Sequence, residues 1–334
     1  LKADGLADDT IVWFWGDHGR GMTRCKRWLY DSGTQVPLMI HVPEKWRDWA
    51  SAGMPDALQP GTVDENLVAF IDFAPTMLSL AGVTLPAHFQ GQAFLGPQRA
   101  KMPREYVYGH RDRMDEAYDL IRMVRDTRFK YFRNFMPDVS YGQDIWYMNQ
   151  MPTLKEMREL HAAGKLAMGP DQYFRPTKPV EELFDTANDP HELHNLADDP
   201  KYAETLQRMR TECLRWMTSI GDTGLIPEPI FDEMKRPGGK WRQAETPALT
   251  ETRPKDGRVS VRLSSLLPGA SIVYATPPKG DSKNAKPEWK LFVPPGVERA
   301  EGEVLLAKVC RMGYRDSEVI RWTVGRSIGA DHAT

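Results

Sequence analysis

An aspartate and a histidine stand side by side after an apolar run, and both side chains suit a divalent metal ion. Residues 10–15 read Thr-Ile-Val-Trp-Phe-Trp, and Gly16, Asp17, His18 and Gly19 follow directly. Asp offers a hard carboxylate oxygen and His an imidazole nitrogen. Adjacent side chains diverge in a regular strand, but at an exit flanked by glycines they can converge on one ion. The pattern predicts that Asp17 and His18 are metal ligands; the alternative is a capped turn with an exposed histidine.

The elements around this pair indicate an α/β fold over residues 1–105. The apolar run before the pair is expected to be a strand buried on both faces, as in a parallel sheet covered by helices, and 36–42 is a second such run. Asp72 is the expected N-cap of a helix with Pro75 in its first turn and Gly82 at its end. In such folds, ligands bind beyond the carboxyl ends of strands.

The middle of the chain changes character and predicts a small antiparallel α+β subdomain over residues 106–225. Apolar runs at 121–124 and 129–132 flank an Asp-Thr turn, which is a hairpin signal, and 182–185 is expected to add a strand. The apolar residues of 199–220 recur at helical spacing and predict an amphipathic helix.

The rest of the chain is predicted to form a loop, a linker and a small β-sandwich. Residues 136–178 are polar and punctuated by Pro and Gly, so we expect a long surface excursion with one helix at 153–163. Such excursions are often binding loops. Residues 226–257 carry little apolar pattern and are expected to be a linker. Short alternating runs separated by turn residues predict a β-sandwich over 258–326.

Composition places the chain among ordinary globular proteins. The 334 residues include 46 acidic and 44 basic side chains, a net charge of -2, which gives no argument for nucleic acid as a partner. The apolar run Ile11–Trp15 is too short to be a membrane span. Cys25, Cys213 and Cys310 are too few and too scattered for a disulfide framework.

Four separated blocks resemble the formylglycine-dependent sulfatase family of the alkaline-phosphatase-like superfamily. They are the Asp-His-Gly strand exit, the lysine loop leading to Thr-Gln-Val-Pro-Leu at 34–38, the Asp-x-x-Pro-Thr-x-Leu-x-Leu-Ala-Gly segment at 72–82, and Glu-Leu-Phe-Asp with Asn-Leu within 182–196. Four blocks in the family's order are more specific than any single one, and the resemblance covers residues 8–220. It implies that the α/β part is a portion of the family's sheet with its helices.

The resemblance implies roles for three residues. Asp17 and His18 match the family's metal-ligand pair, whose ion is usually Ca²⁺, with Mg²⁺ as the alternative. Lys26 matches the lysine that binds the sulfate group and serves catalysis. An ammonium beside a divalent ion can hold sulfate oxygens and stabilise charge on the leaving oxygen. Taken alone, Lys26 is equally compatible with a solvated charge beside Arg24 and Arg27.

The chain departs from the family at the nucleophile. Sulfatases carry Cys-x-Pro-x-Arg or Ser-x-Pro-x-Arg, whose first residue becomes formylglycine, and no Cys or Ser here begins that motif. In the family the motif lies amino-terminal, with two further metal-binding aspartates, and the abrupt start at Leu1 agrees with its absence. We therefore expect the carboxy-terminal part of a sulfatase, inactive by itself.

Basic residues supply candidate substrate contacts. The resemblance implies a histidine or basic residue from the later region near the substrate, which points to His110 and Arg113, and less strongly to Arg111. Arginine suits sulfate or carboxylate groups of an acidic sugar. Arg20, just after the metal pair, is a further candidate. The alternative for the later residues is a surface ion-pair cluster with their acidic neighbours Asp112, Asp115 and Glu116.

The expected activity is hydrolysis of sulfate esters, or of sulfamates, in a sulfated glycan or small molecule. Residues 258–325 resemble the carboxy-terminal β-sandwich of chitobiases and other glycan-degrading enzymes, which favours a glycan by analogy. The family resemblance implies a periplasmic or secreted bacterial enzyme. One alternative is a phosphodiesterase or phosphonate hydrolase of the same superfamily, and another is a non-catalytic sulfatase-like binding protein.

Overall fold

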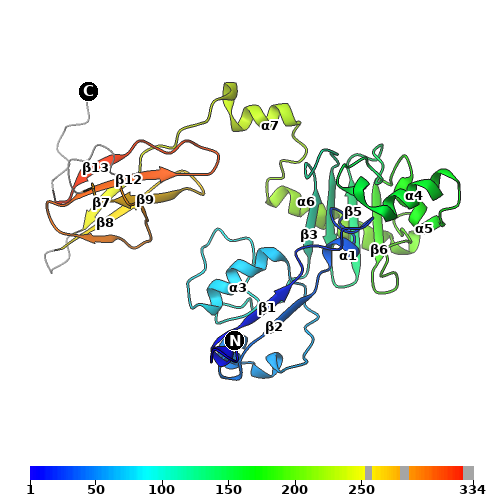
Figure 1. Ribbon diagram of the computed structural model, residues 1–334, viewed down its shortest axis with the longest axis horizontal. Coiled ribbons are helices and arrows are strands. Elements are labelled where there is room, and N and C mark those ends of the chain that lie inside the picture. The colour runs from blue at the N-terminus through cyan, green and yellow to red at the C-terminus, as the bar shows by residue number, and fades with distance from the viewer. Residues whose placement is uncertain (253–257, 279–285, 326–334) are drawn as a thin grey trace. The chain divides into compact units, whose positions relative to one another are not determined.

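The computed structural model describes residues 1–252, 258–278 and 286–325 (Figure 1). Contacts divide the chain into two compact units, Leu1–Leu225 and Ile226–Thr334, which we describe separately. The last residues of the predicted linker, 253–257, lie outside the described part of the chain, as does residue 326 at the end of the predicted sandwich. None of the helices in the described part combines the length and apolar character that crossing a bilayer needs.

The first unit begins with a two-stranded antiparallel sheet. Strand β1 (Val12–Trp15) pairs with β2 (Leu38–His41) in the register Val12↔His41 to Trp15↔Leu38. The expectation of a strand in a parallel sheet, buried on both faces, is therefore wrong for the described residues. A continuous apolar run shows that both faces can be buried, but not that elements are present to cover them.

One face of this ribbon is packed and the other is open. The Trp13 ring lies 5.3 Å from that of Phe73 and 5.6 Å from that of Phe94, measured between ring centroids. Phe14 is 56% exposed, and Met39 on the paired strand is also exposed. Aromatic packing thus secures the ribbon from one side.

Helix α3 (Phe73–Leu80) follows the predicted helix closely, but Asp72 stabilises it in another way. The Asp72 carboxylate makes no side-chain cap to the helix. It accepts hydrogen bonds from the backbone of Ala69 and Gln92 and pairs with Arg104. Asp72 therefore ties three segments together at the start of the helix. Two shorter helices precede it, α1 (Asp31–Thr34) and α2 (Arg47–Ser51).

A four-stranded antiparallel sheet forms the centre of the first unit, in the order β3-β4-β5-β6. The predicted hairpin and the added strand are confirmed, since β4 pairs with β5 and β5 pairs with β6. The strands are β3 (Val107–Arg111), β4 (Ile121–Arg125), β5 (Phe129–Asn134) and β6 (Glu181–Asp185).

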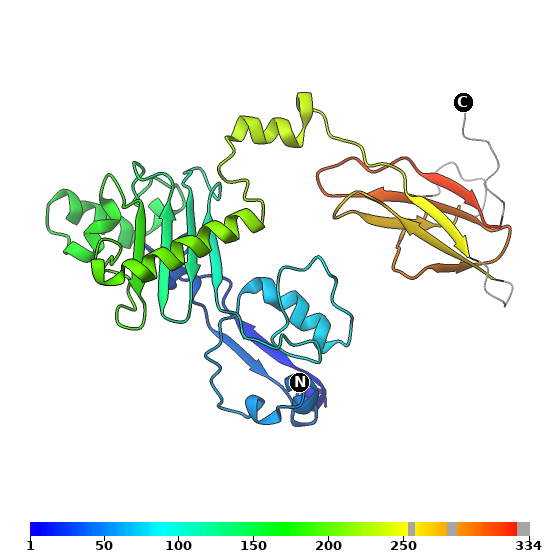
Figure 2. The same cartoon turned by 180° about the vertical axis from the view of Figure 1, so that it is seen from behind.

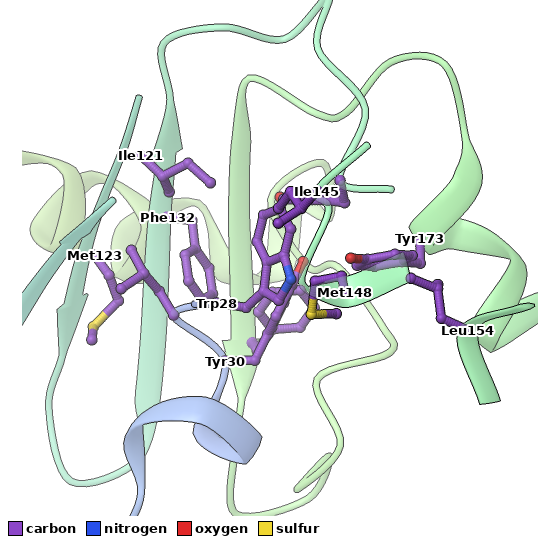
Figure 3. Close-up of a cluster of buried hydrophobic side chains, with 12 residues drawn as sticks. Trp28, Tyr30, Ile121, Met123, Phe132, Ile145, Met148, Leu154 and Tyr173 are labelled. Carbon is purple, nitrogen blue, oxygen red and sulfur yellow. The ribbon is translucent and has the colours of Figure 1, made fainter. Parts of the chain in front are cut away.

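Both faces of this sheet are buried, each against a different partner. Helix α6 (Ala203–Ser219) runs across one face (Figure 2) and packs Met209 and Cys213 against Val124, Tyr131 and Leu183. The opposite face packs against the segment before α1 and against the excursion (Figure 3). Its members are Trp28, Leu29, Tyr30, Ile121, Met123, Phe132, Tyr141, Ile145, Met148, Leu154, Tyr173 and Phe184. Alternate residues of each strand thus supply two separate cores.

The excursion between β5 and β6 contains the predicted helix, α4 (Pro152–Ala162), and a short helix, α5 (Met168–Asp171). Because it contributes side chains to the core, it is anchored to the sheet along part of its length.

The second unit is a helix followed by two small antiparallel sheets. Helix α7 (Glu228–Lys235) precedes the sheets β11-β8-β7 and β10-β9-β12-β13. Their strands are β7 (Ala248–Thr252), β8 (Val259–Ser264), β9 (Ser271–Ala275), β10 (Lys290–Leu291), β11 (Val297–Arg299), β12 (Val304–Cys310) and β13 (Ile320–Thr323). Apolar side chains from both sheets share one core.

The range 226–257 is therefore more structured than the predicted linker, because it holds α7 and β7. Strand β7 pairs with β8 through Ala248↔Ser264 to Thr252↔Ser260, so the first strand of the sandwich lies before residue 258. The sequence pattern of β7 does not predict a strand, because Leu249 is the one large apolar residue in it. Strand β7 lies at the edge of its sheet.

Candidate active site

The side chains of Asp17 and His18 converge just beyond the end of β1. His18 Nε2 lies 3.1 Å from Asp17 Oδ2, and both side chains face solvent. His18 Nδ1 lies 2.7 Å from the carbonyl oxygen of Gly19. A carbonyl can only accept a hydrogen bond, so Nδ1 is the donor in that contact, and Nε2 is the ring nitrogen that faces the Asp17 carboxylate. A bond from the other ring nitrogen to a carbonyl is the usual support for a metal-binding histidine, so this geometry is compatible with the metal role predicted for the pair, which stays a prediction.

Two glycines hold this strand exit against helix α1. A Cβ on Gly19 would lie 1.9 Å from the carbonyl oxygen of Ser32, and one on Gly33 would lie 2.2 Å from that of Cys25. The Gly19 N–H donates to the Gly33 carbonyl at 2.9 Å. No other residue type fits at either position, because the backbones themselves are in contact. These contacts fix the strand exit that carries Asp17 and His18 against α1, which also touches the following loop at Cys25.

Arg20 and Lys26 lie on that loop and are joined through its backbone. The N–H groups of Met22 and Lys26 both donate to the carbonyl oxygen of Arg20, at 2.8 and 2.9 Å. The Lys26 ammonium nitrogen lies 5.5 Å from the centre of the Tyr147 ring on the excursion. The structure therefore brings Lys26 to the excursion and ties its backbone to Arg20, three residues after Asp17 in the sequence.

The loop adopts a strained conformation at two arginines. Arg24 and Arg27 have φ angles of 60° and 79°, a region that residues other than glycine seldom occupy. Arg24 is held by hydrogen bonds to the carbonyls of His191 and Glu192, at 3.0 and 2.9 Å. Strain of this kind persists only where surrounding contacts enforce it, and it is frequent at functional sites.

An ion pair with low exposure joins the loop to the segment that carries Arg113. Arg27 Nε lies 2.7 Å from Asp115 Oδ2, and both side chains are about nine-tenths buried. The guanidinium of Arg113 lies 5.1 Å from the centre of the Tyr118 ring. Lys26 and Arg113 thus lie on segments that are tied together.

His110 and Arg111 have different surroundings. His110, on β3, is exposed and lies near Asp222, whose pKa is lowered chiefly by hydrogen bonds from Arg122. Within the described residues, no hydrogen bond, ion pair or ring contact joins His110 to Asp17, His18 or Lys26. Arg111 is buried, and its guanidinium donates a hydrogen bond to Gln143 Oε1 at 2.9 Å. This guanidinium therefore has a partner within the fold.

A buried charge network below the loop was missed at the sequence level. Lys130, 0% exposed, places its ammonium 2.6 Å from Asp31 Oδ1 and 3.2 Å from Glu192 Oε1. Burial alone would raise the pKa of Asp31, but Lys130 and Arg125 outweigh it and lower that pKa. A lysine on the same strand face as Phe132 was the available signal. The network fixes α1, and with it the Gly19–Gly33 contact.

The two predicted metal ligands, Asp17 and His18, would make up only part of a metal site. Over residues 1–252, 258–278 and 286–325, no group of three or more His, Cys, Asp or Glu side chains is arranged to hold an ion. Ca²⁺ takes six to eight oxygen ligands, so further donors are needed beside this pair. The chemistry of the two side chains fits a divalent ion as a partial ligand set.

A family model, described as Sulfatase, matches residues 1–83. An ulvan-active sulfatase of Formosa agariphila is 38% identical over 323 residues, which cover 96% of this chain and 50% of the relative. A second from the same organism is 29% identical over 72% of this chain and 44% of its own length. The human N-sulphoglucosamine sulphohydrolase is 25% identical over 71% of this chain and 47% of its own. The chain spans about half the length of the curated relatives it matches, and it belongs to the sulfatase family.

Proposed function

We propose that the whole protein hydrolyses sulfate esters of a sulfated glycan. The observation that carries the proposal is the backbone contact of Gly19 with Gly33, which holds the strand exit that carries Asp17 and His18 against α1. Gly33 also lies against the backbone of Cys25, next to Lys26, so α1 adjoins both segments. A cation-binding pair and an ammonium on adjoining segments suit a dianionic group such as sulfate.

The residues of this chain divide the work as follows. Lys26 attracts the sulfate oxygens and stabilises charge that develops on the leaving oxygen. Asp17 and His18 hold a divalent ion, Ca²⁺ or alternatively Mg²⁺, which when bound supplies further positive charge to those oxygens. Arg20, Arg113 and His110 contact acidic or polar groups of the substrate, and Arg113 can bind a carboxylate or sulfate in two-pronged fashion.

The nucleophile belongs to a part of the protein outside these 334 residues. The family's formylglycine arises from Cys-x-Pro-x-Arg or Ser-x-Pro-x-Arg, and neither motif occurs here. Alignment with about half of each relative supports this assignment. We therefore propose that the 334-residue chain alone does not release sulfate.

Relatives guide the choice of substrate. The relative with 38% identity is named for activity on ulvan, so a sulfated polysaccharide is the proposed substrate class. The human relative is named for N-sulphoglucosamine, which keeps sulfamates as the second substrate class to test. A polysaccharide is too large to enter a cell intact, so a periplasmic or secreted location is proposed with it.

The test is sulfate release by the full-length protein carrying formylglycine, with ulvan as substrate and ion chromatography as readout. The Lys26→Ala variant is expected to lose about 100-fold or more in kcat, as for removal of one charge-stabilising donor. Lys201→Ala is the matched control, because Lys201 also lies over a tyrosine ring, at 5.3 Å, on an unrelated surface. Full activity of Lys26→Ala would exclude Lys26 from the site.

The same preparation separates the alternatives. A sulfatase releases 4-nitrophenol from 4-nitrophenyl sulfate faster than from bis(4-nitrophenyl) phosphate or a phosphonate monoester. The reverse order would favour the phosphohydrolase reading. Binding of Ca²⁺ and ulvan without release from any of these substrates would favour a non-catalytic binding protein.

A further inference from the structure

On the excursion, two solvent-exposed aromatic residues lie in sequence between two fully buried aliphatic residues. Trp146 is 72% exposed and Tyr147 is also exposed, whereas Ile145 and Met148 are each 1% exposed. Ile145 and Met148 point into the core beside Trp28 (Figure 3). The chain is therefore anchored on both sides of the pair, and the exposure of the two rings is imposed by the fold.

The backbone of Trp146 is fixed as firmly as its neighbours. Its N–H donates to Glu116 Oε1 at 2.5 Å, and its carbonyl accepts from Gln150 Nε2 at 3.2 Å. The N–H of Asn149 donates to the Ile145 carbonyl at 2.9 Å. A large apolar side chain on a rigid, hydrogen-bonded turn loses little further entropy when something packs on it, which is the property of a preformed contact site.

Two cations lie beside this turn. The Tyr147 ring centre is 5.5 Å from the Lys26 ammonium and 4.8 Å from the Arg27 guanidinium. Arg27 is held in place by Asp115. Because Asp115 balances the charge of Arg27, the positive charge beside this turn is that of Lys26. An apolar surface beside an ammonium suits a ligand that has apolar faces and carries anionic groups, and an acidic sugar chain has both.

We propose that Trp146 is a stacking site for a sugar ring adjoining the sulfated one, and so a specificity-determining residue for a polymeric acidic glycan. The inference rests on the proposed function, because Lys26 defines where the sulfate group lies. The indole covers the C–H face of a pyranose, while the Lys26 ammonium attracts the sulfate or carboxylate groups of the same chain. A small aryl sulfate has no second ring to place there.

The test measures equilibrium binding of ulvan to the 334-residue chain by isothermal titration calorimetry. Trp146→Ala is expected to weaken binding about tenfold, as for loss of one central aromatic anchor, and Trp146→Tyr is expected to restore most of it. Trp241→Ala is the matched control, since Trp241 is also exposed and has a guanidinium, that of Arg236, 3.7 Å from its ring centre. Trp241→Ala is expected to bind like the parent.

Equal binding by Trp146→Ala and the parent would overturn the inference, as would failure of the parent chain to bind ulvan, heparan sulfate and chondroitin sulfate. In the full-length enzyme, Trp146→Ala should raise KM for ulvan by a larger factor than it lowers kcat. If ulvan binding depends on Trp146 but the full-length protein releases no sulfate, the stacking site stands and the proposed function fails.

Discussion

The first unit contains two sheets built from similarly apolar strands, but only the β3–β6 sheet is covered on both faces. In that sheet, Phe132 is 2% exposed and lies in a core of twelve buried residues. In the β1–β2 ribbon, Phe14 is 56% exposed. The difference lies in the partners: α6 and the excursion enclose one sheet, whereas in the described residues α3 and its surroundings cover one side of the other.

The two sheets also differ in where they keep their charges. The β3–β6 sheet buries Lys130 between Asp31 and Glu192, and the ribbon presents Asp17 and His18 at its exposed end. Buried ion pairs make a structure sensitive to the loss of one partner, and exposed ones do not. We therefore expect the free energy of unfolding to depend more on the charges of the covered sheet than on those of the open ribbon, whose Asp17 and His18 are accessible to solvent.

The largest expected effect is that of Lys130→Met. The substitution leaves Glu192 buried without its cation and leaves Asp31 with Arg125 alone. Removal of one partner from a buried pair typically destabilises by about 3–5 kcal/mol. Urea denaturation followed by hydrogen-exchange mass spectrometry of the β5 peptide measures this loss separately from the second unit. Lys201→Met, at an exposed lysine, is the control and should leave the midpoint unchanged. A shift of similar size in both variants would mean that the network does not stabilise this sheet.

The comparison between the sheets is sharpened by a pair of phenylalanine truncations. Phe132→Ala opens a cavity in a closed core and should destabilise by about 3–5 kcal/mol. Phe14→Ala removes a side chain that is mostly in solvent, so its effect should stay within about 0.5 kcal/mol. Hydrogen exchange of the β5 and β1 peptides, measured on both variants in the same urea series, gives the two values. Equal losses would show that the open face of the ribbon is covered in solution.

Much of the covered sheet could be predicted from sequence, because its signals are local. The Asp-Thr turn between two apolar runs predicted the β4–β5 hairpin, and helical spacing over 199–220 predicted α6. The burial of β1 could not be predicted in the same way, since exposure depends on elements far away in the sequence. Strand β7 was missed because an edge strand with one large apolar residue has almost no alternation to detect.

In the candidate site, too, local features could be predicted from the sequence and contacts between distant residues could not. Glycines next to an Asp-His pair are a local signal, and the structure shows why glycine is needed at residue 19. The network of Asp31, Lys130 and Glu192 joins residues that are distant in sequence, so no local spacing predicts that they form ion pairs. The roles of Arg20, Lys26, His110 and Arg113 remain predictions, with Lys26 and Arg113 on segments tied by an ion pair.

The smallest expected effect is in the pH dependence of the covered sheet, where two carboxylates of one network act in opposite directions. The pKa of Asp31 is lowered from 3.8, so its stabilisation is complete above that value and is lost as the pH falls through the folded-state pKa. Burial outweighs Lys130 at Glu192 and raises its pKa from 4.5, so stability is lost as the pH rises above 4.5. Asp31→Asn should therefore flatten the acid limb of the stability profile of the β5 peptide, and Glu192→Gln should flatten the limb above 4.5. Identical profiles for the two variants and the parent would mean that neither carboxylate changes its proton affinity on folding. The ribbon buries no such pair, so exchange of the β1 peptide provides an internal reference in every measurement.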